Sequence, residues 1–77
     1  MKTGRIVLPG SWGRYDCIIK DVSDTGARLR LAGEGVILPS HFELVFVTEA
    51  VVYPVQLRWR RELEAGVEFF GTPRKLT

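Results

Sequence analysis

The chain of 77 residues is long enough for one domain but too short to build two separate cores. Its composition, 45% apolar and 26% charged, is that of a folded domain, and its net charge of +2 is weak for a dedicated duplex-binding protein. The single cysteine excludes an internal disulfide, and no apolar run is long enough to cross a bilayer. We therefore expect a cytoplasmic protein that does not insert into membranes.

Hydrophobic alternation predicts six strands, in chain order at residues 5–8, 15–22, 27–31, 41–47, 51–60 and 67–70. The clearest is 27–31, where Arg28 and Arg30 alternate with apolar residues and share the outer face. In the fifth strand Pro54 lacks an amide donor, which predicts an edge position or a bulge. Residues 62–66 are assigned to a turn, and no window favours a helix of three turns.

Six short strands at this spacing predict an all-β fold, and closure into a small antiparallel barrel best hides the sheet edges of so short a chain. We place the barrel domain at residues 1–71 and expect residues 72–77 to form a flexible tail.

Catalytic chemistry has little support in the sequence. His41 is the only histidine, and Cys17, the only cysteine, lies far from it along the chain, so neither a metal-ligand set nor a nucleophile with its base can be recognised. Cys17 fits a small buried apolar residue, and His41 fits a polar residue at the start of a strand. We therefore expect a binding module without catalytic residues, metal or cofactor.

The connection between the second and third strands carries the pattern Asp-x-Ser-x-x-Gly, formed by Asp21, Ser23 and Gly26. By itself the pattern is typical of many turns, because Asp and Ser bond to nearby backbone and Gly supplies a positive φ. The same residues can also bind a nucleotide. A carboxylate accepts from the donor edge of guanine, a hydroxyl bonds to base or phosphate, and glycine leaves room for close approach.

With its surroundings, this pattern resembles the PilZ domain family. It is followed by Gly26-Ala27-Arg28-Leu29, by a Phe42-Glu43-Leu44 strand, and by segments 55–60 and 66–69 that are similar to the last two strands of that family. The resemblance extends from about Lys2 to Phe70. It implies a six-stranded β-barrel of the split-barrel type that binds cyclic di-GMP and regulates motility, surface polysaccharide or virulence.

The candidate ligand-binding residues are therefore the three of the motif and three further residues: Asp21, Ser23, Gly26, Arg28, Trp59 and Arg5. Trp59 offers a stacking surface for a base, although the alternation of its strand favours a core position. Arg5, Arg14, Arg28 and Arg30 are each explained more simply as solvated residues, but they are the cations available to replace other phosphate contacts.

The sequence departs from the family at its start. PilZ domains carry an Arg-x-x-x-Arg pair before the first strand, whereas no two arginines have that spacing here, and residues 2–7 already align with the first strand. We expect such a pair to lie upstream of Met1 or to be missing. A bidentate arginine contact contributes roughly 1–3 kcal/mol to binding. Loss of both contacts would therefore weaken binding by about 2–6 kcal/mol, on the order of 10- to 10⁴-fold in affinity.

Two other functions remain open. The first is a PilZ-like adaptor that binds no nucleotide and docks on an effector protein. The second is a small barrel that binds single-stranded nucleic acid through Trp12, Tyr15 and Trp59, which the low net charge disfavours.

Overall fold

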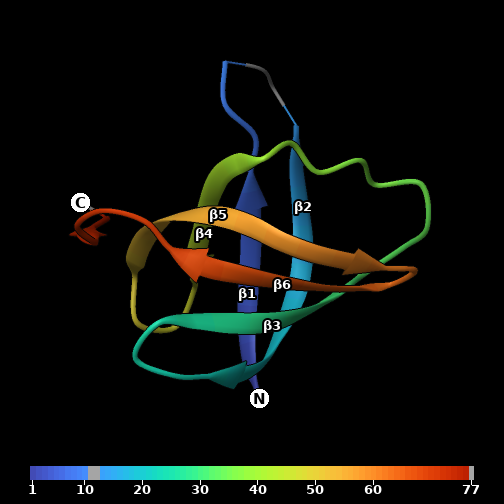
Figure 1. The fold of residues 1–77 in the computed structure, drawn as a ribbon. Coiled ribbons are helices and arrows are strands. Elements are labelled where there is room, and N and C mark those ends of the chain that lie inside the picture. Colours follow the sequence, from blue (N-terminus) through green and yellow to red (C-terminus); the bar gives the residue numbers. More distant parts are fainter. Residues whose placement is uncertain (11–12, 77) are drawn as a thin grey trace.

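The computed structural model describes residues 1–10 and 13–76, and these contain strands, turns and loops but no helix. The part of the chain that it describes therefore offers no helix that could span a membrane. The strands, shown in Figure 1, are β1 (Lys2–Val7), β2 (Arg14–Val22), β3 (Gly26–Leu31), β4 (His41–Phe46), β5 (Val51–Arg61), β6 (Glu64–Phe69) and β7 (Arg74–Lys75).

The first six strands form a closed antiparallel barrel. Their order is β4-β1-β2-β3-β6-β5, and a further pairing of β4 with β5 closes the ring, so that each of the six has two neighbours. In Figure 1, β1 and β2 run across the direction of β3, β6 and β5, as expected for strongly twisted strands that wrap around one core. The predicted six-stranded β-barrel is confirmed.

The core fills the barrel with side chains from alternate positions of the strands. In β3, Leu29 and Leu31 are buried whereas Arg28 and Arg30 are exposed, as the alternation predicts. The largest fully buried side chains come from five of the strands: Ile6, Ile19, Leu29, Leu44, Val52 and Val55. This packing leaves the polar faces of β2, β3, β5 and β6 outside.

The prediction for Pro54 is wrong in both forms, because β5 is not an edge strand and its irregularity lies elsewhere, between Leu57 and Trp59. Pro54 is opposite Glu43 of β4, and its carbonyl accepts a hydrogen bond from the backbone N–H of Phe70. In a strand the nitrogen and the carbonyl of one residue point to the same side. The missing donor of Pro54 therefore faces β6 where that ladder ends, and no ladder bond to β4 is lost.

The turn predicted at 62–66 is shorter than expected, because β6 begins at Glu64. Only Glu62 and Leu63 connect β5 to β6, and Glu62 has a φ of 50°, the left-handed conformation that such tight hairpins require. Gly66, which we assigned to the turn, lies inside β6 opposite Trp59.

The C-terminal segment continues the sheet past the expected boundary at residue 71. Arg74 and Lys75 form β7, which pairs with Val52 and Val51 of β5. The Arg74 guanidinium donates to both carboxylate oxygens of Glu43, at 2.8 and 3.1 Å. Residues 74 and 75, which we placed in a flexible tail, thus lie against the barrel.

Candidate functional site

The turn between β2 and β3 is closed by Ser23. Its backbone N–H donates to the carbonyl of Gly26 at 2.8 Å, and its hydroxyl oxygen accepts from the N–H groups of Thr25 and Gly26, both at 3.3 Å. These are the local side-chain to backbone bonds by which serine stabilises turns. The Ser23 hydroxyl therefore already serves the fold.

Gly26 is needed for a different reason from the one its position in a turn indicates. Its φ is not positive, and it is buried as the first residue of β3. A Cβ at this position would lie 2.1 Å from the carbonyl oxygen of Val67 in β6. The space that glycine leaves is therefore occupied by the backbone of the neighbouring strand and not by a free opening for a ligand.

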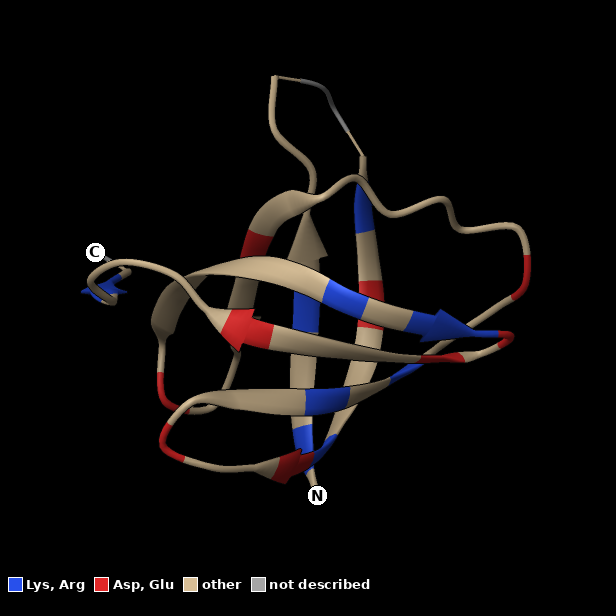
Figure 2. Cartoon of the chain, in the orientation of Figure 1, with Lys and Arg blue, Asp and Glu red and all other residues tan. Residues whose placement is uncertain are grey.

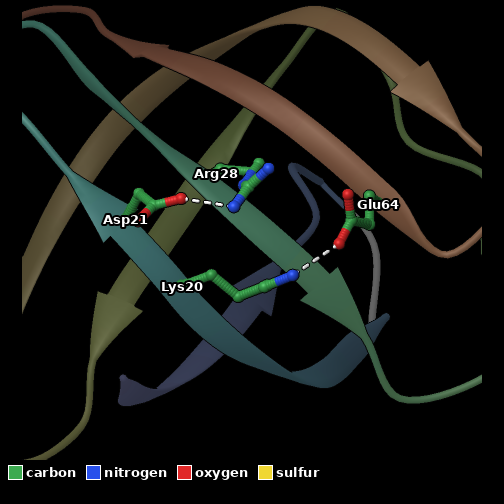
Figure 3. Close-up of polar contacts among 4 residues, drawn as sticks. All are labelled: Lys20, Asp21, Arg28 and Glu64. Carbon is green, nitrogen blue, oxygen red and sulfur yellow. Dashed lines mark hydrogen bonds and ion pairs between the residues drawn. The ribbon is translucent and has the colours of Figure 1, made fainter.

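A β-bulge positions the carboxylate of the motif. The pairing of β2 with β3 shifts between Ile19 and Asp21, so that Lys20 and Asp21 together lie opposite Arg28. The Asp21 carboxylate contacts the Arg28 guanidinium at 2.6 Å, and the Lys20 ammonium donates to Glu64 of β6 at 2.8 Å (Figure 3). The bulge thus brings two ion pairs to the outer face of the barrel.

A second bulge, in β5, turns the tryptophan outward. The register shifts between Leu57 and Trp59, so that Arg58 and Trp59 together lie opposite Gly66. A Cβ on Gly66 would lie 2.1 Å from the indole nitrogen of Trp59, which shows that the indole rests on this glycine. The expected core position of Trp59 is therefore wrong: its side chain lies on the surface, and the residue is 44% exposed.

These elements surround an open hollow of about 430 Å³ on the outer face of β2, β3, β6 and β5. We call it the outer groove. Its lining comes from the end of β2 and the following turn, from β3, and from the facing parts of β5 and β6: Asp21, Val22, Ser23, Thr25, Gly26, Ala27, Arg28, Arg58, Trp59, Gly66, Val67 and Glu68. The volume lies within the range of small-molecule sites, about 300–1,000 Å³.

The structure brings five of the six predicted site residues to this groove: Asp21, Ser23, Gly26, Arg28 and Trp59. The sixth, Arg5, does not line it, because it lies on β1 and contacts Asp16 of β2 at 3.5 Å. Sequence reasoning missed Arg58 and Glu68, which also line the groove and contact each other at 3.6 Å.

The electrostatics of the groove are mixed. Figure 2 shows basic and acidic residues interleaved over β2, β3, β5 and β6. The hydrogen bond from Lys20 lowers the pKa of the Glu64 carboxyl, which therefore stays ionised further into acid than an isolated glutamate. The Asp21–Arg28 and Arg58–Glu68 pairs are exposed, so water screens them and their members can change partners, whereas the Lys20–Glu64 pair is partly buried.

The two residues that we examined for catalysis lie elsewhere. Cys17 is buried in the core, as predicted, and burial raises the pKa of its thiol to about 12. His41 is the exposed first residue of β4, and its ring meets that of Phe70 edge to face at 4.9 Å. Of the aromatic residues considered for nucleic acid, Tyr15 does not line the groove and Trp12 lies outside the described residues.

Comparison with known proteins gives one match. A family model described as the PilZ domain matches residues 2–76, while the searches of curated proteins and of solved structures returned no significant match. PilZ domains are in general binding and regulatory modules that act as cyclic di-GMP receptors and interact with effector proteins. Because the match covers nearly the whole chain and the strands close into the same kind of barrel, the chain belongs to the PilZ domain family.

Proposed function

We propose that this domain is a cytoplasmic, non-catalytic signalling module whose outer groove binds cyclic di-GMP. The observation that carries the proposal is the convergence of a carboxylate, a guanidinium and an indole from three strands, Asp21, Arg28 and Trp59, on one open hollow. Asp21 and Trp59 lie at bulges, which are frequent beside binding sites because they change the direction of a side chain, and Arg28 faces outward by the alternation of β3.

Each of these groups has a role toward a guanine nucleotide. The exposed indole of Trp59 offers a flat surface on which a base stacks, a contact worth about 1–3 kcal/mol. The Asp21 carboxylate accepts hydrogen bonds from the donor edge of guanine, and Arg28 and Arg58 donate to phosphate. Arg28 is available because its pair with Asp21 is exposed, and such pairs cost about 0–1 kcal/mol to break.

We expect the affinity of residues 1–77 to be low. They contain no Arg-x-x-x-Arg pair, and two other members of the motif, Ser23 and Gly26, already hold the turn and the β3–β6 contact. If a complete site binds in the micromolar range, loss of about 2–6 kcal/mol moves dissociation toward the millimolar range.

The first test compares two aspartate variants by calorimetry with cyclic di-GMP. Asp21→Ala removes the carboxylate in the groove, whereas Asp16→Ala removes a carboxylate that pairs with Arg5 outside it. We expect Asp21→Ala to weaken binding about tenfold or more, and Asp16→Ala to leave it within about twofold. Equal effects of the two substitutions would show that the ligand does not use the groove.

A second candidate function is an adaptor that docks on an effector protein without nucleotide, and it is favoured by the structural roles that Ser23 and Gly26 already have in the fold. Calorimetry separates the two functions, because the adaptor gives no heat of binding up to millimolar cyclic di-GMP. In that case the Asp21→Ala domain should still bind its effector as the unchanged domain does.

A further inference from the structure

A second hollow adjoins the outer groove. It measures about 360 Å³ and is lined by Arg28, Trp59, Arg61 and Glu64. Arg28 and Trp59 also line the outer groove, so the two hollows share these side chains as a common border.

The strand register places the second hollow on the far side of that border. Arg28 and Trp59 both lie opposite Gly66, whereas Arg61 lies opposite Glu64, two residues nearer the β5–β6 turn. The outer groove extends the other way, toward Glu68. A ligand that passes over the Arg28 and Trp59 side chains would therefore occupy both hollows in sequence.

The charge of the second hollow favours an anion. Arg61 is exposed, and its side chain forms no ion pair or hydrogen bond with any residue at positions 1–10 or 13–76. Glu64, the only acidic group of the lining, is already engaged by Lys20 at 2.8 Å. The other guanidinium of the lining, Arg28, is paired with Asp21 at 2.6 Å, so Arg61 is the lining cation without an ion pair among the described residues. Planar guanidinium groups match phosphate oxygens in geometry.

We propose that the second hollow is a phosphate subsite with Arg61 as its principal donor, through which the domain distinguishes a dinucleotide from a mononucleotide. The proposal rests on the function proposed above. A mononucleotide that stacks on Trp59 and contacts Asp21 fills only the outer groove. A ligand with two linked nucleotides places its other half, with a second phosphate, within the reach of Arg61.

The test compares two arginine variants with two ligands, cyclic di-GMP and guanosine monophosphate. Arg30→Ala is the matched control, since Arg30 lies on the same outer face and near Glu64 but lines neither hollow. We expect Arg61→Ala to weaken cyclic di-GMP binding about 10- to 100-fold and to change the affinity for guanosine monophosphate by less than about twofold. Arg30→Ala should change the affinity for each ligand by less than about threefold. If the two variants behave alike, or if Arg61→Ala weakens both ligands equally, the proposal is wrong.

A titration with inorganic phosphate, followed by NMR, separates this proposal from the proposed function. Phosphate should shift the signals of Glu64 saturably in the unchanged domain and in Arg30→Ala, but not in Arg61→Ala. This result, together with no binding of either nucleotide, would keep the anion subsite and remove the cyclic di-GMP receptor. Equal shifts in all three proteins, or no shift in any, would remove the subsite.

Discussion

At the scale of single residues, the fold and the candidate site depend on the same glycines. The carbonyl oxygen of Val67 packs against Gly26, and the indole of Trp59 packs against Gly66. A Cβ added to either glycine would lie only 2.1 Å from the nearest atom of its partner. These contacts could not be predicted from the sequence. Val67 is distant from Gly26 along the chain, and Trp59 reaches Gly66 only because of the bulge in β5. For this reason Gly26 was interpreted as a turn residue and Gly66 was placed in a loop.

Gly26→Ala should destabilise the domain by about 1–3 kcal/mol, because the added methyl group meets backbone that cannot rotate away. Gly33→Ala is the control, since a Cβ there has no neighbour within 4 Å and its φ is not positive. Urea unfolding measures both variants. If Gly26→Ala unfolds at the same urea concentration as Gly33→Ala, the close contact between β3 and β6 does not exist.

Gly66→Ala should act on the site more than on stability, because the atom that it meets belongs to a side chain that can move. We expect the indole N–H resonance of Trp59 to shift and cyclic di-GMP affinity to fall about tenfold or more as the stacking surface is displaced. The measurement is NMR for the indole and calorimetry for the ligand. Unchanged affinity with a displaced indole would show that Trp59 does not stack on the base.

At the scale of elements, the two bulges determine which side chains reach the groove. Alternation predicted the strands and the outward face of β3, because those properties depend only on local sequence. It could not predict a register shift, which depends on how a partner strand pairs. Trp59 was therefore placed on the core face, and Arg58, its companion in the bulge, was missed as a groove residue.

The pair formed at the β2 bulge predicts a pH effect. Lys20→Gln should raise the pKa of Glu64 toward its ordinary value, whereas Lys2→Gln should do so for Glu49, whose pKa is lowered by the hydrogen bond from Lys2. NMR titration of the carboxyl groups measures both. A carboxyl group whose pKa is lowered by folding stabilises the folded state at pH values above its pKa in the unfolded chain. This stabilisation is lost as the pH falls through the pKa of the group in the folded state.

The urea midpoints of the unchanged domain and Lys20→Gln should therefore differ at about pH 7 and converge at about pH 2. A difference of the same size at both pH values would mean that Lys20 acts through packing and not through the charge of Glu64.

At the scale of the whole molecule, closure of the barrel places the candidate site on the outer face of paired strands. β1 to β6 each pair on both sides, and β7 continues the sheet beside β5, so the candidate ligand-binding groups lie on a face and not at an open edge. Closure was predictable from the number and length of the strands. The attachment of Arg74 and Lys75 was not, because two polar residues in a short tail carry no hydrophobic pattern.

The central claim is that the outer face of β2, β3, β6 and β5 binds cyclic di-GMP, and its most direct test is an NMR titration that follows the backbone amides. We predict saturable shifts at residues 21–28 and 58–68, with amides near Arg5 and Asp16 unmoved. Shifts centred on β1 and β4, or no shift up to millimolar ligand, would contradict the claim.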